Sequence, residues 1–289
     1  MMITFLDIVI AGLLMGGIYA IIAVGLSLQY GVARVFNISH GEFIMLGAFG
    51  TWILFSLYKV NPIVSLVICG PVLFVIGFVI HKIVFMKLLK TSKTMDIFES
   101  KSMLAAFGFV YIIQNIAILL WGSDIKGYSY LNQPVNIAGA VFAANRLVTL
   151  LFALIIGLIF YLFLARTRLG KAIRASAQDP TTARLMGINI NQVLALCFGF
   201  GALMAGFAGT LLSLCFSIKA TMGLEYAIIA IIVVVLGGLG SIIGSFIGGF
   251  LLGIIGSIAT YVQPSSALIA YYVIFVLLLL ARPKGIMGK

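Results

Sequence analysis

The densest group of chemically capable side chains is the hexapeptide NISHGE at residues 37–42, which holds Asn37, Ser39, His40 and Glu42. Amide, hydroxyl, imidazole and carboxylate groups beside a flexible glycine suit a solute pathway or an inner gate. The same residues also fit a structural turn, in which Ser39 caps the next helix, Glu42 completes a capping box and His40 bonds a backbone carbonyl. The residue types alone leave both hypotheses open.

A second polar segment, TRLGKAIRASAQDPTTARLMGINI at residues 167–190, lies in a chain of which only 9% is charged. Thr167 is placed to cap a short amphipathic helix with three basic residues on one side. Asp179 is placed to cap a second helix that starts at Pro180, and Gly187 is placed to end it. The segment therefore predicts two short helices joined by a sharp corner, and we call it the polar hairpin.

Two roles fit the polar hairpin. A basic amphipathic helix can lie on an anionic membrane surface, held by charge and by shallow apolar burial. Arg168, Lys171 and Arg174 supply such charge in the first helix. The second helix has Arg184 as its one basic residue and little apolar area to grip lipid, which favours docking in the groove of a partner protein.

Several kinds of chemistry find no support in the sequence. The phosphate-binding pattern G-x-x-x-x-G-K-[ST] is absent, since its nearest match, TRLGKA, lacks the first glycine and the Ser or Thr after lysine. Cys69, Cys197 and Cys215 lie in apolar stretches without metal-ligand spacing, which predicts small buried side chains and no metal site. With no evident nucleophile or carboxylate pair in an apolar stretch, we expect no enzyme and no cofactor in this chain.

The elements that carry these groups follow from composition. Of 289 residues, 63% are hydrophobic, and the mean hydropathy is +1.25, whereas soluble domains are about half apolar and about a quarter charged. Apolar runs recur along the chain, and about 20 residues cross a hydrocarbon core. Because the runs lack the alternation of barrel strands, we predict helices. The fold class is therefore all-α, a polytopic integral membrane protein with a single transmembrane domain over residues 1–289.

The predicted spans number about nine, or eight with a broken or re-entrant segment. Residues 29–41 are ambiguous, and so is the glycine-rich junction 237–244, which fits either a tight turn or a break inside one long helix. Residues 122–144, rich in turn formers and with interfacial Tyr128 and Tyr130, are expected to form an external loop. The predicted spans are 5–28, 42–58, 62–85, 102–121, 145–165, 192–216, 225–240, 242–262 and 266–281.

Basic residues gather at the ends of three apolar runs, and the positive-inside rule places these ends in the cytoplasm. An odd number of crossings then puts the N-terminus outside and the C-terminus inside. The net charge of +11 forms no single patch of the kind that binds nucleic acid. The clusters are Lys82, Lys87, Lys90, Lys93 and Lys101; Arg166, Arg168, Lys171, Arg174 and Arg184; and Arg282, Lys284 and Lys289.

Small residues at four-residue spacing predict close helix packing. Such residues share one helix face, where missing side chains let two backbones approach closely. Four sets favour a compact bundle over helices that face only lipid. The sets are Gly12 and Gly16; Gly201, Ala205 and Gly209; Gly240, Gly244 and Gly248; and Gly249 and Gly253.

Four stretches together resemble the permease subunits of branched-chain amino acid ABC importers: ARVFNISHGEFIMLGAF at 33–49, the polar hairpin, VVLGGLGSIIGSFIGGFLLG at 234–253 and ARPKGIMG at 281–288. The resemblance implies the fold of the branched-chain amino acid and sugar permeases, with a paralogous permease as partner. It also implies two cytoplasmic ATPases that bind ATP and magnesium, and an external solute-binding protein. Residues 166–191 would couple the permease to the ATPases through Thr167, Arg174, Asp179, Pro180, Ala183, Arg184 and Gly187.

The function expected from this resemblance is import of branched-chain amino acids, or of small polar solutes such as urea or amides, across a bacterial inner membrane. An ion-coupled secondary transporter is an alternative, because sodium coupling through backbone carbonyls leaves little trace in a sequence. Proton-driven carriers usually keep Asp or Glu inside the membrane, and here Asp7, Glu42 and Glu225 are the nearest acids to it. No charged residue deep in a span offers an evident partner for an amino acid.

Overall fold

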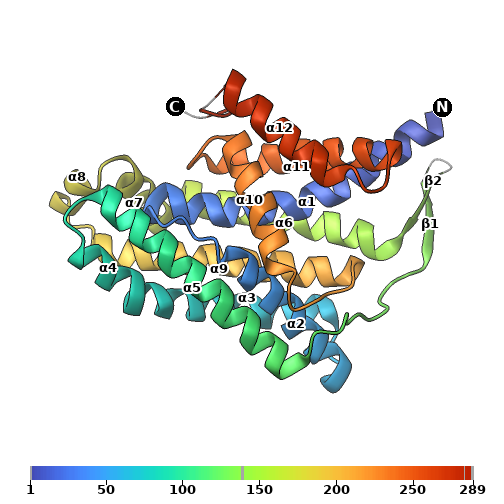
Figure 1. Ribbon diagram of the computed structural model, residues 1–289, viewed down its shortest axis with the longest axis horizontal. Coiled ribbons are helices and arrows are strands. Elements are labelled where there is room, and N and C mark those ends of the chain that lie inside the picture. The colour runs from blue at the N-terminus through green and yellow to red at the C-terminus, as the bar shows by residue number, and fades with distance from the viewer. Residues whose placement is uncertain (1, 138–139, 283, 288–289) are drawn as a thin grey trace.

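The computed structural model describes residues 2–137, 140–282 and 284–287, in which most helices lie along one direction (Figure 1). A π-helix, η1 (His81–Phe85), joins α3 to α4 without a break, and an antiparallel pair of strands, β1 (Pro134–Ile137) and β2 (Ala140–Ala143), precedes α6. The α-helices are α1 (Met2–Ala33), α2 (His40–Tyr58), α3 (Pro62–Ile80), α4 (Met86–Thr91), α5 (Met95–Trp121), α6 (Ala144–Arg166), α7 (Arg168–Gln178), α8 (Pro180–Leu185), α9 (Ile190–Cys215), α10 (Gly223–Gly237), α11 (Ile242–Val262) and α12 (Ala267–Ala281).

In the described part of the chain, seven helices are long and apolar enough to cross a membrane, and α10 and α12 are shorter apolar helices. The predicted all-helical membrane architecture is therefore confirmed. The largest boundary error is at α5, which begins at Met95 instead of residue 102. Thr94 caps that helix by accepting a hydrogen bond from the backbone N–H of Ile97, at 3.4 Å. The helix therefore starts in a polar segment that precedes its apolar run.

The centre of the bundle is formed by α1 and α9. These are the most enclosed spans, with 67% and 78% of their most apolar segments buried. α1 packs most extensively against α11, and α9 packs most extensively against α3. The trio α1, α2 and α3 is thus matched by the trio α9, α10 and α11, which runs through the bundle in the opposite direction (Figure 1).

The second helix of each trio begins inside the bundle instead of at its end. His40, the first residue of α2, lies beside the middle of α1, where its Nε2 is 3.0 Å from the carbonyl oxygen of Ile22. The first turns of α2 and α10 meet, because Gly41 packs on the backbone of Gly223 so closely that a side chain has no room there. From this contact the two helices run to opposite ends of the bundle (Figure 1). Each of these crossings is therefore part helix and part extended linker.

Glycines form the seam between α1 and α11. A Cβ added at Gly12 would lie 2.6 Å from the Cα of Ile254, and one added at Gly16 would lie 2.7 Å from the Cα of Phe250. Gly253 on the facing helix is equally close to the backbone of Gly16. Any larger residue at these positions would push the two helix backbones apart.

The other predicted packing glycines also lie at helix contacts, although their partners differ. Those of α9 face the first two spans, and those around the start of α11 face α1 and α10. The contacts are Gly201 with the Gln29 side chain, Gly209 with the carbonyl group of Ile44, Gly240 with Gly31, Gly244 with Gly237 and Gly248 with the carbonyl oxygen of Val233.

The ambiguous junction at 237–244 is a turn between α10 and α11. Gly238 and Gly240 have φ angles of 104° and 82°, which side chains rarely allow. This end of α10 is also paired with the chain's last described residues, because the backbone N–H of Ile286 donates to the carbonyl oxygen of Leu236 at 2.9 Å.

Residues 122–144 are not simply a loop, since they include β1 and β2. The strands pair Val135 with Phe142, over a stretch too short to give a periodic signal in the sequence. The segment before them is fastened to the linker between α9 and α10, because Lys126 and Ile218 exchange two backbone hydrogen bonds of 2.8 Å. This end of the bundle therefore has an ordered surface connected to its interior.

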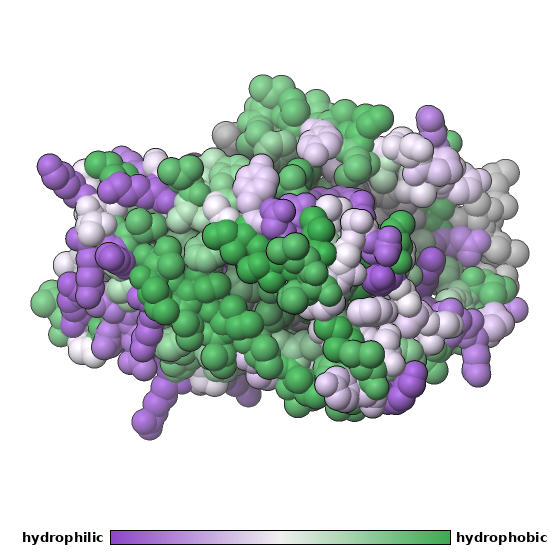
Figure 2. Space-filling view, turned by 60° about the horizontal axis from the view of Figure 1, so that its bottom comes forward, coloured by the Kyte–Doolittle hydropathy of each residue, from purple (hydrophilic) through white to green (hydrophobic). Residues whose placement is uncertain are grey.

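The polar groups divide between the two ends of the bundle. The N-terminus and the strands lie at one end, and α4, α7 and α8 lie at the other (Figure 1). Figure 2 shows hydrophilic residues gathered at the latter end and a broad hydrophobic surface beside them. The basic clusters around residues 82–101 and 166–184 thus share one end, as the charge pattern predicts.

Candidate functional site

The polar hairpin consists of α7 and α8, and both of its predicted N-caps are confirmed. The Thr167 hydroxyl accepts a hydrogen bond from the backbone N–H of Gly170 at 3.0 Å. The Asp179 carboxylate accepts from the N–H groups of Thr181, at 2.8 Å, and Thr182, at 3.2 Å. These bonds satisfy N–H groups that a helix start leaves free. The corner between the two helices is therefore held by local contacts.

The end of α8 and the contact between α7 and α6 are also held by hydrogen bonds. Gly187 has a φ angle of 84°, and its N–H donates to the carbonyl oxygen of Arg184 at 3.0 Å, which ends α8. The Arg174 guanidinium donates to the carbonyl oxygen of Ala165 at 3.2 Å and so holds α7 against the end of α6. The hairpin is thus a rigid projection of the span that precedes it.

The tip of the hairpin carries two large apolar side chains that the sequence analysis did not single out. Leu185 is 83% exposed and Met186 is 79% exposed. Ala183 behaves in the opposite way, because it is only 4% exposed and packs into the hydrophobic core. Of the residues expected to couple, Ala183 therefore supports α8 from beneath, while Arg184 and its two apolar neighbours face outward.

Hydrogen bonds keep Asp179 ionised. The Thr182 hydroxyl and the N–H groups of Thr182 and Thr181 stabilise its charged form, so the pKa of this exposed carboxyl lies below its ordinary value of 3.8. At neutral pH the residue is therefore an anion at the N-terminus of α8, where the helix dipole favours negative charge.

The NISHGE segment forms a different kind of site in the middle of the bundle. The Ser39 hydroxyl donates to the Asn37 side-chain oxygen, the Asn37 amide donates to Gln29 at 3.0 Å, and the Gln29 amide donates to the carbonyl oxygen of Phe198 at 3.1 Å. All three side chains are at most 1% exposed. This buried chain of bonds joins α1, the linker before α2, and α9.

The predicted capping box is wrong. Ser39 precedes α2 but makes no side-chain cap, since its hydroxyl is turned to Asn37. Oxygen Oε2 of Glu42 has no hydrogen-bond partner among the described residues. The expected bond from His40 to a carbonyl is confirmed at Ile22. Long-range packing has therefore overridden the local pattern.

Glu42 instead lies against α10. It is 1% exposed, and its carboxylate fills the space where a side chain at Gly223 would stand. Gly41 packs on the same glycine. We call this contact between the first turns of α2 and α10, together with Asn37, Ser39 and His40, the central joint. The Glu42 carboxyl group thus lies where the first turns of the two helices meet.

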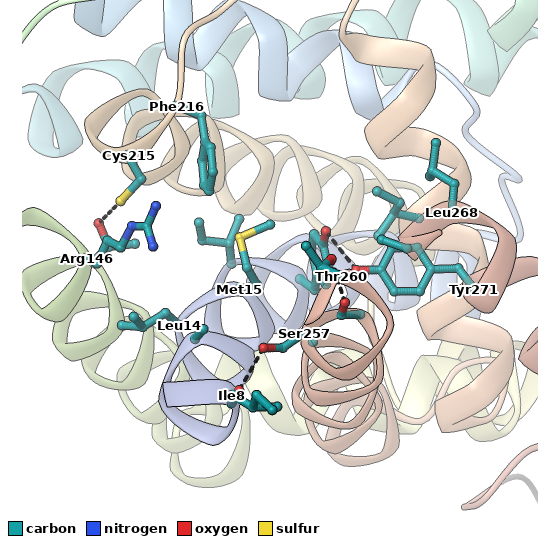
Figure 3. Close-up of a pocket in the computed structure, with 18 of the residues that line it drawn as sticks. Ile8, Leu14, Met15, Arg146, Cys215, Phe216, Ser257, Thr260, Leu268 and Tyr271 are labelled. Carbon is teal, nitrogen blue, oxygen red and sulfur yellow. Dashed lines mark hydrogen bonds between the residues drawn. The ribbon is translucent and has the colours of Figure 1, made fainter. Parts of the chain in front are cut away.

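A cavity of about 520 Å³ lies between α1, α6, α10, α11 and α12, near the ends of these helices that are remote from the polar hairpin. Figure 3 shows Arg146 at one side of it, on α6, and Leu268 and Tyr271 at the other, on α12. Asp7 and Glu225 also line the cavity, so both signs of charge face one space. We call it the mixed-charge cavity.

Several uncharged polar groups of the cavity wall are hydrogen-bonded within the wall. The Ser257 hydroxyl donates to the carbonyl oxygen of Ile8 at 2.7 Å, and the hydroxyls of Tyr19 and Tyr271 are 3.4 Å apart. Arg146 has no ion pair with any described residue, whereas Glu225 pairs with Lys219 at 3.7 Å while staying about half exposed. Arg146 is therefore free to meet a solute, and Glu225 keeps exposed surface beside its ion pair.

Sequence reasoning missed this cavity because its charged residues are far apart in the chain and lie near the ends of predicted spans. Glu225 is near the start of an apolar run in the sequence, but α10 begins inside the bundle, which carries that residue inward.

Comparison with known proteins gives matches over nearly the whole chain. Residues 8–282 match the family described as "Branched-chain amino acid transport system / permease component". The chain is 30% identical to the high-affinity branched-chain amino acid transport system permease protein LivH of Salmonella typhimurium, over 99% of this chain and 96% of that protein. The protein of the same description from Pseudomonas aeruginosa, BraD, is 29% identical over 99% and 96%. PsaBC from Streptococcus pneumoniae, solved in complex with Fab, shares the fold with a TM-score of 0.50 and 14% identity, over 95% of this chain and 91% of that one.

Proposed function

The chain belongs to the family of permease components of branched-chain amino acid transport systems, and on this premise we propose that it moves leucine, isoleucine and valine, or closely related small solutes, through a membrane. It is a multi-pass transport subunit of an ABC importer. In this proposal the chain has no ATPase site of its own. Two partner ATPases bind ATP and magnesium, a paralogous permease completes the path, and an external binding protein supplies the solute.

The observation that carries the proposal is the apolar tip of the polar hairpin. Leu185 and Met186 stand exposed on a helix pair that is otherwise capped, rigid and continuous with α6. Exposed apolar groups rimmed by polar residues are typical of protein contacts. Seated in an ATPase groove, the hairpin would transmit a movement of the ATPase to α6 and α9, the spans that it joins.

The proposed orientation puts the hairpin end in the cytoplasm of a bacterial cell and the N-terminal end outside. The charge distribution supports it, because the lysines of residues 82–101 and the arginines of the hairpin lie at the same end (Figure 1). The mixed-charge cavity then lies nearer the side from which a binding protein delivers solute.

The central joint is proposed as the gate between the two ends. α2 and α10 start at one point and run in opposite directions, so a shift of either helix changes the packing at Gly41 and Gly223. Packed interfaces of this kind switch between discrete arrangements and do not deform continuously. Asn37, Ser39, His40 and Glu42 would hold one arrangement of the gate.

Reconstituted uptake tests this function. The chain, its paralogous permease and the two ATPases are placed in liposomes with the binding protein outside, and labelled leucine uptake is measured with ATP inside or with a sodium or proton gradient. We expect ATP-dependent uptake that needs the binding protein and ignores the gradients. Uptake by this chain alone, driven by an ion gradient, would instead identify a secondary transporter.

A further inference from the structure

The charged and apolar parts of the mixed-charge cavity are arranged for a particular class of molecule. Arg146 stands at the start of α6, and its guanidinium points toward Met15 across the cavity (Figure 3). Because it has no ion pair among the described residues, its five N–H donors are available to a carboxylate, which guanidinium binds in a planar, two-pronged geometry.

The negative side of the cavity is provided by α10. Glu225 lies in the first turn of this helix and keeps 45% of its side chain exposed despite its contact with Lys219. A carboxylate has two oxygens and can accept several hydrogen bonds at once, so it can bind an ammonium group while Lys219 stays near. Asp7 adds a second negative charge to the same lining.

The rest of the lining is mainly apolar. Met15, Ile18, Phe216 and Leu268 line the same space and offer a surface for an aliphatic side chain. A volume of about 520 Å³ is within the usual range for small-molecule sites, which is roughly 300–1,000 Å³. An acyl chain alone would occupy only the apolar part of this lining.

We propose that the mixed-charge cavity is a binding site, within this single subunit, for a zwitterionic α-amino acid with an aliphatic side chain, in which Arg146 holds the carboxylate and Glu225 holds the ammonium group. The proposal rests on the proposed function, because it names a place where the transported solute stops. It adds that the permease itself binds the charged groups of the solute, after the binding protein has released the solute.

The fold connects this site to both ends of the molecule. Phe216 belongs to the linker 216–222, which Lys126 fastens to the surface segment before the strands through Ile218. Glu225 lies in the first turn of α10, which begins at the central joint and ends at Gly237, near the C-terminal residues. A movement of α10 driven from the hairpin end would therefore change the distance between Glu225 and Arg146 and so alter the site.

Binding in this cavity is tested by placing a cysteine in its wall and measuring how far a bound molecule slows the reaction of that cysteine with a thiol reagent. Leu268, which lines the cavity and is 43% exposed, is replaced by cysteine in a Cys215→Ala background. The assembled importer, without binding protein, is treated with N-ethylmaleimide, and labelling of this chain is read by mass. The probes are leucine, leucinol, which lacks the carboxylate, and 4-methylpentanoate, which lacks the amine.

Leucine is expected to slow labelling in a saturable way, and both incomplete analogues should protect less well. Arg146→Gln should raise the leucine concentration for half-protection by about 10- to 100-fold, the usual effect of losing a hydrogen bond to a charged group, and should remove the advantage of leucine over leucinol. Arg146→Lys should restore part of the protection. Glu225→Gln should remove the advantage over 4-methylpentanoate.

Lys59→Gln is the matched control, because Lys59 is a basic residue at the turn between α2 and α3 and does not line the cavity. Equal protection by all three probes, no protection by leucine, or unchanged protection in Arg146→Gln would overturn the proposal. ATP-driven uptake measured on the same preparations separates the two claims. If uptake persists while leucine gives no protection, the cavity assignment fails and the transport function stands.

Discussion

The polar hairpin and the central joint are both polar segments between helices, yet different interactions hold them. In the hairpin, Thr167 and Asp179 bond to residues two or three positions away. In the joint, Asn37 bonds to Gln29, Gln29 bonds to the backbone at Phe198, and Gly41 packs on Gly223. The hairpin can therefore move as a unit without losing its shape, whereas the joint exists only while the two halves of the bundle stay in register.

The largest effect is expected at the glycine contact of the joint. Gly41→Leu should prevent α2 and α10 from meeting and so abolish folding of the permease, because the space at Gly41 is already filled by the backbone of Gly223. Yield of monodisperse protein from membranes measures this. Gly108→Leu is the matched control, since a Cβ there meets no atom within 4 Å, and it should express normally. Equal yields of the two variants would contradict the proposed packing.

A strong but different effect is expected at the hairpin tip. Leu185→Asp combined with Met186→Asp should reduce ATP-driven uptake at least about tenfold, because truncating a dominant contact at the centre of an interface costs about 2 kcal/mol of binding or more. The permease should still fold, since both side chains are exposed. Co-purification of the ATPases measures docking. Ile125→Asp, at another well-exposed apolar residue near the opposite end, should leave the ATPases bound.

A moderate effect is expected from breaking the buried hydrogen-bond chain. Asn37→Ala leaves the Ser39 hydroxyl and the Gln29 side-chain oxygen without their partner, at a cost of about 1–2 kcal/mol. We expect the thermal unfolding midpoint of Asn37→Ala to be lower than that of the parent protein. Asn115→Ala is the comparison, because the Asn115 amide bonds only to the carbonyl oxygen of Tyr111 in its own helix, and its midpoint should stay close to that of the parent protein.

The smallest effect is expected at the Asp179 cap. Asp179→Asn keeps the acceptor oxygen and should nearly preserve protection of α8 amides from hydrogen exchange, while Asp179→Ala should lose it, since alanine is a poor cap. The lowered pKa of Asp179 means that its stabilising contribution is present above the ordinary value of 3.8 and is lost only as pH falls through the lower folded value. Protection should therefore be constant between about pH 5 and pH 8, and a loss within that window would contradict the proposed cap.

The contrast between hairpin and joint also shows what could be predicted from the sequence. Spans, hairpin caps and packing glycines depend on hydrophobicity and on neighbours a few residues away, and residues such as Thr167 and Asp179 carry that information themselves. The capping box at Ser39 failed because a distant partner, reached through Asn37 and Gln29, outcompeted the local bond.

The mixed-charge cavity could not be predicted for the same reason. Arg146 and Glu225 are brought to one space only by the packing of α6 and α10 around α1, and neither residue stands inside a continuous apolar run. The strands at 134–143 escaped notice because four residues give too short a pattern. Side-chain exposure at Leu185 and Met186 was likewise hidden, since an apolar residue near a helix end is as often buried as exposed.

The most direct test of the central claim is a crosslink from the hairpin tip to an ATPase subunit. Met186→Cys, in membranes that contain the assembled importer, should crosslink to an ATPase, with a yield that changes when ATP is added. Ala183→Cys, buried on the same helix, should crosslink poorly under the same conditions. If Met186→Cys gives no ATPase crosslink with reagents of several lengths, or is labelled by an impermeant reagent from outside intact cells, the hairpin is not the contact through which this permease is driven.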